Sequence, residues 1–338
     1  MTEIRSVEWV GGEDGHVRIL DQTLLPGEET YIDISFLKSA CEAIRTLKVR
    51  GAPLLGVFGL YALALGVRQL GNSTGAQKAM QDSARSIKAT RPTAVNLSAE
   101  IDSSTRTAKN VEDVSMLVAM TIARGSAVAK SDAAASDMIG QHGQELIADG
   151  GLYLTHCNTG SLATAGIGTA LGIFKTAHRA GKRFRVLVPE SRPLLQGSRL
   201  TAWELEREGI PYKLCCESAL GAIYSTMNVH ATITGADRIA RNGDTANKTG
   251  TLIHAILCER YGVPFYIAAP FSTFDTGCPN GEGVPIEHRG AHEVRRVKGI
   301  LVAPAEANAV NPAFDVTPAE LISGFVTEKG ILQPPFGD

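Results

Sequence analysis

Short apolar segments alternate with helical patterns through the second half of this 338-residue chain, and this alternation constrains the fold most strongly. The expected strands are Gly151–His156, Phe184–Pro189, Tyr212–Cys216, His230–Thr234, Pro264–Ala268 and Gly299–Val302. Helical patterns lie between most of them, at Leu162–Arg179, Pro193–Glu208, Ala219–Met227 and Lys248–Tyr261. Short apolar strands that alternate with helices are typical of a parallel sheet covered on both faces. The sequence therefore predicts an α/β fold with a Rossmann-like, doubly wound parallel sheet in this half.

The first half has a different pattern. Val7–Val10 and Val17–Leu20 flank Gly-Gly-Glu-Asp-Gly, which predicts a small β-hairpin. The helical stretches that follow are Ile34–Leu47, Pro53–Gly66, Ala76–Lys88 and a long one from about Ser98 to Asp149. The break at Asp149-Gly150-Gly151 predicts a boundary between a mainly helical N-terminal domain, residues 1–149, and the sheet domain, residues 150–338.

Charge and hydropathy argue against several classes of protein. The net charge is −2 and no basic block is interleaved with aromatic residues, so a nucleic-acid partner is not expected. The N-terminus lacks a basic region followed by an apolar core, so it is not a signal peptide. The longest apolar run, Ala52–Gly66, is shorter than the roughly 20 residues that span a bilayer. We expect a cytoplasmic protein with no membrane segment.

The six cysteines have irregular spacing, and no Cys-x-x-Cys occurs. This pattern fits neither a zinc site nor a disulfide framework, so we expect reduced thiols and no metal. One cysteine has a special place. The first expected strand ends at His156, a turn follows over Cys157–Gly160, and a helical pattern begins at Leu162. The thiol of Cys157 would then lie at the carboxyl end of a strand and beside a helix N-terminus.

In open α/β sheets, ligands bind at the carboxyl ends of the strands. A helix N-terminus there favours anions, including a thiolate. The simpler alternative for Cys157 is a small buried cysteine that ends a strand.

Three further segments point to the same edge of the sheet. Gln196 follows the second strand, and Asp237 follows the fourth, where a carboxylate could act as a general acid or base. Asn247 and Lys248 open the next expected helix, and their amide and ammonium groups could hold a phosphate. Ordinary loop roles are the alternatives, such as a helix cap for Asp237.

Two arginines in the helical half are also candidate anion ligands. Arg50 precedes Gly51-Ala52-Pro53 at a helix start, and Arg91 precedes Pro92 in a turn. Guanidinium groups offer paired donors to tetrahedral anions. The alternative for both is a solvated arginine beside a turn.

Several cofactor and nucleophile motifs are missing from the sequence: no Gly-x-Gly-x-x-Gly follows the first strand, and no Walker loop, Gly-x-Ser-x-Gly or His-Glu-x-x-His occurs. We therefore expect no cofactor. A thiol, a carboxylate and phosphate ligands suit a small phosphorylated substrate that undergoes proton or hydride transfer.

Seven motifs, in order from about Leu20 to about Ile322, resemble the methylthioribose-1-phosphate isomerase family and its initiation factor 2B alpha/beta/delta-like superfamily. The motifs are Val49–Pro53, Arg91–Leu97, His156–Gly160, Arg192–Gly197 with Leu200–Leu205, Gly235–Arg238, Asn242–Asp244 with Asn247-Lys248, and Asn311–Pro318.

The resemblance implies a homodimeric aldose–ketose isomerase that needs no cofactor and converts 5-methylthioribose 1-phosphate to 5-methylthioribulose 1-phosphate in methionine salvage. It also implies that Cys157 and Asp237 are the catalytic pair. The substrate ligands that it implies are Arg50, Gly51, Ala52, Arg91, Gln196, Asn247 and Lys248.

The chain departs from the family pattern at Ser191, Glu217 and His288, near loops that could close over the 5-substituent. Isomerases of 5-deoxyribose 1-phosphate or ribose 1,5-bisphosphate are therefore alternatives. A second alternative is a sensor that binds a sugar phosphate or nucleotide without turnover, as the related regulatory subunits of initiation factor 2B do. A thiol-based hydrolase lacks a clear base, because His156 should point to the opposite side of the strand from Cys157.

Overall fold

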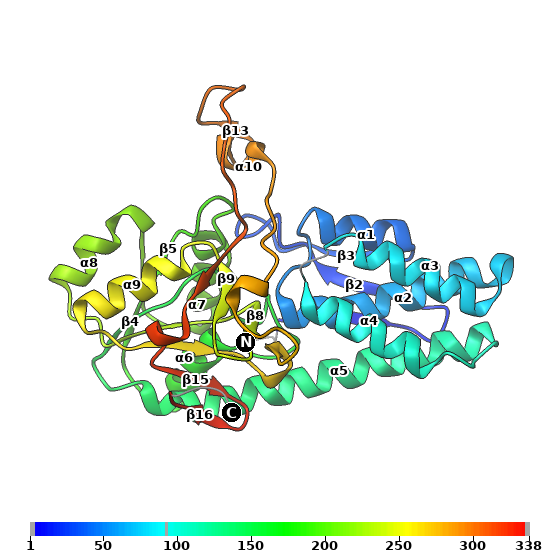
Figure 1. Cartoon of the computed structure of the whole chain (residues 1–338), viewed down its shortest axis with the longest axis horizontal. Helices are drawn as coiled ribbons and strands as arrows, with labels where there is room; N and C mark the ends of the chain where they lie inside the picture. Colours follow the sequence, from blue (N-terminus) through cyan, green and yellow to red (C-terminus); the bar gives the residue numbers. More distant parts are fainter. Residues whose placement is uncertain (1–3, 92–93, 335–338) are drawn as a thin grey trace. The chain divides into compact units, whose positions relative to one another are not determined.

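The computed structural model describes residues 4–91 and 94–334 and contains two compact units (Figure 1). One unit is built from the chain up to Ala135 together with Ser161–Gly168, and the other from Ser136–Gly160 and the chain from Thr169 onwards. The units therefore divide inside helix α5, which runs from Val114 to Gly143. The domain boundary after Asp149 stays a prediction.

The N-terminal unit begins with the predicted hairpin, β1 (Val7–Val10) and β2 (His16–Leu20). A third antiparallel strand, β3 (Tyr31–Ile34), pairs with β2. The hydrophobic pattern of the sequence did not predict β3, because β3 is a short edge strand whose side chains are mostly exposed or half-buried. The helices that follow β3 are α1 (Leu37–Arg45), α2 (Ala52–Thr74), α3 (Ala76–Lys88), α4 (Val95–Thr107) and α5 (Val114–Gly143). The single long helix expected from Ser98 is wrong, since α4 ends at Thr107 and a separate helix, α5, begins at Val114.

Helix α2 is longer than its predicted run and is apolar almost all round. Its Ala52–Gly71 segment is long and apolar enough to cross a membrane, but 83% of the apolar window is buried inside the protein. It packs against α3 and α4, and Leu54, Phe58 and Leu65 are fully buried or nearly so. Helix α2 is therefore the core helix of this unit.

The other unit contains a seven-stranded sheet in the order β16-β15-β10-β7-β4-β5-β6, with every pair parallel except β15–β16. Its strands are β4 (Leu152–Leu154), β5 (Arg185–Pro189), β6 (Tyr212–Cys215), β7 (Ala231–Thr234), β10 (Phe265–Ala268), β15 (Gly324–Thr327) and β16 (Gly330–Leu332). The order of the six parallel strands reverses between β4 and β7, as in a doubly wound fold. The predicted fold class is confirmed.

Helices cover both faces of this sheet. Phe174 of α6 (Ala170–Arg179) packs with Tyr153 of β4 on one face, together with α7 (Ala202–Glu208). Tyr224 of α8 (Leu220–Thr226) packs with Leu152 and Leu154 on the opposite face, together with α9 (Thr251–Tyr261). Successive residues of β4 therefore serve two cores, which explains why its sequence is continuously apolar.

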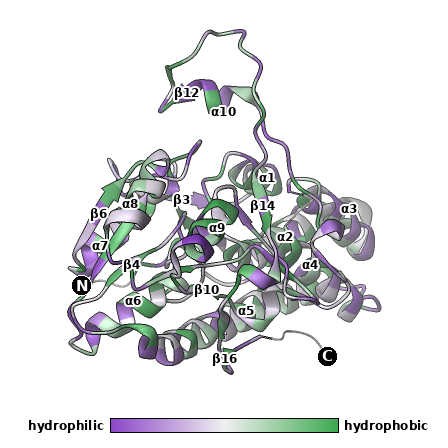
Figure 2. Cartoon of the chain, turned by 60° about the vertical axis from the view of Figure 1, so that its left-hand side comes forward, coloured by the Kyte–Doolittle hydropathy of each residue, from purple (hydrophilic) through white to green (hydrophobic). Residues whose placement is uncertain are grey.

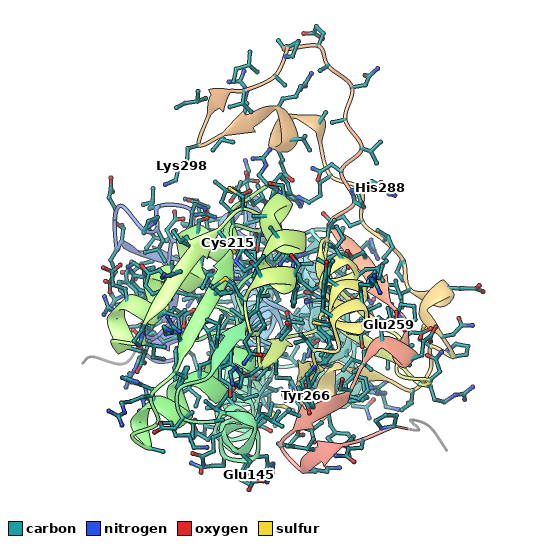
Figure 3. All side chains as sticks on the ribbon, turned by 90° about the vertical axis from the view of Figure 1, so that its left-hand side faces the viewer. Glu145, Cys215, Glu259, Tyr266, His288 and Lys298 are labelled. Carbon is teal, nitrogen blue, oxygen red and sulfur yellow. The ribbon has the colours of Figure 1, made fainter. Side chains whose placement is uncertain are left out.

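The expected strand Gly299–Val302 is not part of the sheet. Ile300–Leu301 (β13) instead pairs with Arg296–Val297 (β12) in a small hairpin after α10 (Ala291–Arg295). Figures 2 and 3 show α10 and this hairpin as an arm that stands away from the parallel sheet, and Figure 3 labels His288 near the base of the arm. The apolar side chain of Ile300 is 69% exposed, so a hydrophobic run here did not signal a buried strand.

A smaller four-stranded sheet has the order β11-β8-β9-β14, and its strands are β8 (Arg238–Ala240), β9 (Thr245–Lys248), β11 (Phe274–Asp275) and β14 (Phe314–Thr317). The helix predicted from Lys248 is therefore wrong at its start, because Lys248 ends β9 and α9 begins at Thr251. Pairing of β9 with both β8 and β14 outweighs the local helical pattern.

Candidate active site

The loops that carry Cys157 and Asp237 lie side by side, at the point where the strand order reverses. β4 and β7 are parallel neighbours, with Leu154 opposite Thr232. A Cβ added to Gly235 would come within 2.7 Å of Cγ2 of Thr159, so the two loops touch. Ligands in doubly wound sheets bind in the crevice at this switch point. A thiol and a carboxylate therefore reach the same edge of the sheet.

Polar contacts hold Cys157 in an uncommon backbone conformation, with φ of 58°. Its N–H donates to Oγ of Ser191 at 2.9 Å, and its carbonyl accepts from Oγ1 of Thr201 at 2.5 Å. The predicted helix N-terminus beside Cys157 is wrong, because α6 begins at Ala170 rather than Leu162. Residues 161–168 form turns that pack within the N-terminal unit, where the N–H of Leu54 donates to the carbonyl of Ala163.

A buried ion pair supports the residues after Cys157. Nζ of Lys175 lies 2.7 Å from Oε2 of Glu204, and both side chains are essentially inaccessible to solvent. Oε1 of Glu204 accepts from the amide of Asn158 at 2.8 Å. A Cβ at Gly160 would overlap Oε2 of Glu204, so glycine is required there. Sequence reasoning missed Lys175, which resembles an ordinary charge on a helical segment, and included Glu204 only as part of the motif Leu200–Leu205.

Asp237 lies in the loop between β7 and β8 and is half-buried. Its backbone N–H donates to the carbonyl of Ala246 at 3.0 Å, which holds the loop against β9. The next residue, Arg238, forms an ion pair with Asp275. Asp237 thus follows strand β7 as predicted, three residues after its last residue.

Asn247 and Lys248 lie together at the end of β9. The amide of Asn247 donates to Oγ1 of Thr234 at 3.2 Å and to Oγ1 of Thr251 at 3.0 Å. The ammonium of Lys248 donates to the carbonyl of Ala313 at 2.8 Å. Both side chains are largely buried. A desolvated ammonium attracts an anion more strongly than a solvated one, which suits a phosphate ligand.

Asp315 was found only as part of a motif, and the structure gives it a definite role. Its two carboxylate oxygens accept the backbone N–H groups of Gly250 and Leu252, at 2.6 and 3.2 Å. It therefore caps the N-terminus of α9, which begins at Thr251, shortly after Lys248. Burial raises the pKa of Asp315 to about 6.

Gln196 is 5% exposed, and its Oε1 has no hydrogen-bond partner among residues 4–91 and 94–334. It precedes a π-helical turn, Gly197–Thr201, that leads into α7. The helix predicted from Pro193 is therefore wrong at its start, because α7 begins only at Ala202, after this π-helical turn. A buried amide oxygen without a partner is costly, so a ligand that donates to it would relieve that cost.

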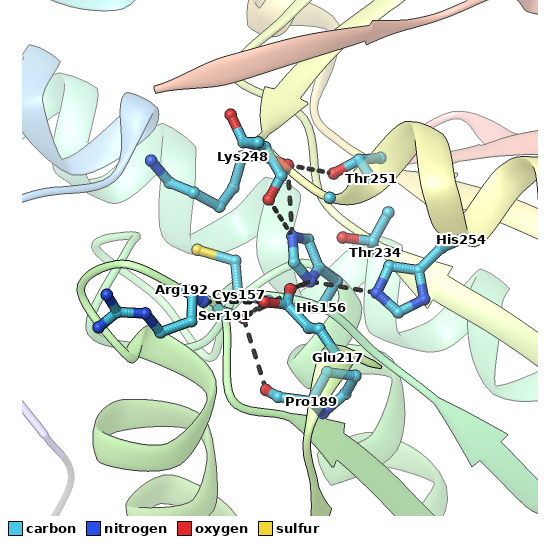
Figure 4. A network of polar contacts seen from close by, with 12 residues as sticks. His156, Cys157, Pro189, Ser191, Arg192, Glu217, Thr234, Lys248, Thr251 and His254 are labelled. Carbon is cyan, nitrogen blue, oxygen red and sulfur yellow. Dashed lines mark hydrogen bonds and ion pairs between the residues drawn. The ribbon is translucent and has the colours of Figure 1, made fainter. Parts of the chain in front are cut away.

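His156, next to Cys157, belongs to a buried polar cluster (Figure 4). Its Nε2 lies 3.1 Å from the carbonyl of Thr249, and its Nδ1 lies 3.3 Å from Nε2 of His254 and 3.4 Å from Oε1 of Glu217. Burial lowers the pKa of His156 to about 4. The prediction of no metal site did not foresee this cluster, whose members are up to 98 residues apart in sequence.

The remaining predicted ligands belong to the N-terminal unit. Arg50 is half-buried and immediately precedes Gly51, whose φ of 99° favours glycine. A Cβ at Gly51 would approach Ala163 to 2.5 Å, and Ala52 is the first residue of α2. Arg91 is half-buried and follows α3, whereas Pro92 and Thr93 of its motif lie outside the described residues.

Comparison with known proteins agrees with the family resemblance of these motifs. Residues 48–334 match the model of the initiation factor 2 subunit family. The chain belongs to this family. A methylthioribose-1-phosphate isomerase from Pelotomaculum thermopropionicum is 43% identical over 337 residues, which cover 98% of this chain and 92% of that protein. A protein of the same name from Geobacter metallireducens is 45% identical, over 97% of this chain and 95% of its own length.

Solved structures of similar proteins show the same fold. The 5-methylthioribose 1-phosphate isomerase of Pyrococcus horikoshii has a TM-score of 0.86 and is 34% identical, covering 99% of this chain and 94% of its own. The delta subunit of translation initiation factor eIF-2B from A. fulgidus has a TM-score of 0.83 and is 36% identical, covering 98% and 97%. The resemblance stated from the motifs is confirmed.

Proposed function

We propose that this protein is an aldose–ketose isomerase that converts 5-methylthioribose 1-phosphate to 5-methylthioribulose 1-phosphate. The observation that carries the proposal is the similarity to methylthioribose-1-phosphate isomerases over almost the entire chain, at 43% and 45% identity. The chemistry of the site supports it, because a thiol and a carboxylate follow neighbouring strands at one edge of the parallel sheet. Lys248, whose ammonium is buried, has its carbonyl 3.3 Å from Nε2 of His156, the residue before Cys157.

Cys157 and Asp237 are the catalytic residues of the proposal. The 1-phosphate locks C1 of the sugar as an acetal, so the ring opens only when its ring oxygen receives a proton. Asp237 supplies this proton and later takes the proton of the C2 hydroxyl. Cys157 assists the transfer of hydrogen from C2 to C1.

That transfer can take two routes. In the first, the thiolate of Cys157 removes the proton from C2, and the thiol then returns a proton to C1 of an enediol-like species. In the second, the hydrogen moves from C2 to C1 as a hydride, and Cys157 flanks the migrating atom. Solvent deuterium distinguishes them, since efficient incorporation at C1 of the product excludes a direct hydride shift.

We assign substrate binding to Gln196, Asn247 and Lys248 in the sheet unit and to Arg50, Gly51, Ala52 and Arg91 in the N-terminal unit. Lys248 contributes a buried positive charge, while Asn247 is oriented by Thr234 and Thr251. The proposal also includes a homodimer, a cytoplasmic location, and catalysis without a cofactor, as the family resemblance implies.

A second candidate function is a sensor that binds a sugar phosphate or a nucleotide without turnover. It is favoured by the similarity to the eIF-2B delta subunit from A. fulgidus, which is 36% identical. A sensor needs the phosphate ligands but not the pair Cys157 and Asp237. Turnover therefore separates the two functions.

The test is isomerisation of 5-methylthioribose 1-phosphate, 5-deoxyribose 1-phosphate and ribose 1,5-bisphosphate by the purified protein. Preference for the first substrate supports the proposal. Preference for another keeps the reaction but changes the substrate. Binding without turnover of any of the three contradicts the proposal and supports the sensor.

A further inference from the structure

We propose that His156, His254 and Glu217 form a binding site for one divalent transition-metal ion, Zn²⁺ in particular. The three residues come from the loop after β4, from helix α9 and from the turn after β6. All three lie in the sheet unit, and the inference does not depend on the isomerase proposal.

The distances in the cluster fit a metal site. The three possible ligand atoms lie within 4.8 Å of one another. His156 Nδ1 is 3.3 Å from His254 Nε2 and 3.4 Å from Glu217 Oε1. Ligand atoms about 2.0–2.1 Å from a tetrahedral Zn²⁺ are roughly 3.3–3.4 Å from each other. These two separations therefore match two edges of a zinc tetrahedron.

The other nitrogen of each ring is already engaged. Nε2 of His156 faces the carbonyl oxygens of Thr249 and Lys248, at 3.1 and 3.3 Å, so it carries the proton and leaves a lone pair on Nδ1. Nδ1 of His254 lies 3.5 Å from the hydroxyl of Tyr224, which can accept its N–H. With that tautomer, both inward-facing nitrogens present lone pairs. A bound cation would satisfy them together.

Glu217 completes the set with an oriented carboxylate. Its Oε2 accepts the backbone N–H of Arg192 at 2.9 Å. Its Oε1 is buried and has no hydrogen-bond partner in the part of the chain that the structure describes. That oxygen faces the lone pair of His156 Nδ1, an unfavourable contact unless a proton or a cation lies between them. In metal sites, a ligating side chain is typically oriented by a hydrogen bond to its other polar atom, the one that does not bind the metal.

The donor set selects the kind of ion. Two imidazoles and one carboxylate suit Zn²⁺ and neighbouring transition metals, while Mg²⁺ and Ca²⁺ prefer oxygen ligands throughout. Three protein ligands leave a fourth position for water or for Oγ of Ser191, which lies 3.5 Å from His156 Nδ1. Because Ser191 also accepts the N–H of Cys157, the ion would tie the Cys157 loop to α9 and to the turn after β6.

The test uses the full-length protein after treatment with a chelator and dialysis. We expect calorimetry to show one equivalent of Zn²⁺ bound, and Co²⁺ to give the visible absorption bands of a site with low coordination number. Zn²⁺ should also raise the thermal midpoint. Failure of the wild-type protein to bind Zn²⁺ or Co²⁺ overturns the proposal.

Two variants locate the site. Glu217→Gln keeps the shape of the side chain and removes its charge, and His254→Leu removes one nitrogen ligand. Each should weaken Zn²⁺ binding at least tenfold and abolish the thermal shift. Matched controls are Glu282→Gln and His292→Leu, at exposed positions outside the cluster, which should bind like the wild type. If both cluster variants bind Zn²⁺ as tightly as the controls, the proposal is wrong.

Discussion

The backbone N–H of Cys157 donates a hydrogen bond to Oγ of Ser191, and both residues have a positive φ, of 58° and 63°. The two lie in loops that follow the neighbouring strands β4 and β5. Non-glycine residues rarely adopt this conformation, and it persists where surrounding contacts impose it. The Ser191 hydroxyl therefore helps to hold the thiol of Cys157 in place.

Replacing Ser191 by alanine should damage both stability and turnover. The N–H of Cys157 would lose its acceptor in a buried place, which costs about 1–3 kcal/mol of unfolding free energy. We also expect kcat to fall at least tenfold, because the thiol is no longer held in position. Urea unfolding and steady-state kinetics measure the two effects. Ser225→Ala, on the exposed face of α8, is the control and should change neither.

Replacing Cys157 by serine should reduce kcat severely while substrate binding stays close to normal. The hydroxyl fills nearly the same space but ionises far less readily than a thiol. Kinetics and substrate titration by calorimetry measure the two properties separately. Cys216→Ser, at an exposed cysteine, should behave like the wild type. Full activity of the Cys157 variant would contradict the assignment of Cys157 as a catalytic residue.

Replacing Lys248 by alanine should raise KM more than it lowers kcat, because a positive charge that binds phosphate is lost in a desolvated place. The loss of its bond to Ala313 should also lower the thermal midpoint slightly. Lys213→Ala, at an exposed position on β6, provides the comparison. Unchanged KM for the Lys248 variant would move the phosphate site elsewhere.

The ion pair between Lys175 and Glu204 should matter far more than a similar pair on the surface. Lys175→Met leaves the carboxylate of Glu204 buried without its counter-charge, at a cost of about 3–5 kcal/mol. Arg179→Met breaks the more exposed pair with Glu208 between the same two helices and should cost less than about 1 kcal/mol. Chemical denaturation compares them. If the two variants lose the same unfolding free energy, burial does not make the Lys175–Glu204 pair more important than the exposed pair.

Asp132, in the N-terminal unit, should make stability depend on pH. Its carboxylate accepts the N–H of Ala165 at 2.6 Å, yet burial raises its pKa to about 6. The folded state therefore holds this proton more tightly than the unfolded state, whose carboxyl has a pKa near 4. As pH rises from about 4 to about 6, the folded state must bury a charge, and stability falls.

Asp132→Asn should remove this dependence. The variant should match the wild type near pH 4 and exceed it at pH 7 by up to about 3 kcal/mol, which corresponds to the size of the pKa shift. Denaturation at several pH values tests the difference. Asp137→Asn, at an exposed position on the same helix, should leave the pH profile unchanged. A constant difference between Asp132→Asn and wild type at all pH values would contradict the assigned cause.

The predictions from sequence were most successful where the signal is local. The strands β4, β5, β7 and β10 were found because each is a short, mainly apolar run, and β6 was found although it contains the exposed Lys213. The placement of Cys157 and Asp237 after β4 and β7 followed directly, since a residue that follows a parallel strand must reach the carboxyl edge of the sheet. Lys248 was placed in a helix because its strand partner, Phe314 of β14, is far away in the sequence and leaves no local signal.

The amino-acid sequence by itself determined the α/β class, the edge of the sheet where the reactive groups gather, and, through its motifs, the family. Only the tertiary structure decided which distant side chains meet. The carboxylate of Glu204 contacts Asn158 and Lys175, and His254 contacts His156. These partners are 29 to 98 residues apart in sequence. Such contacts arise when helices from separate crossovers pack on one sheet, and no periodicity along the chain encodes them.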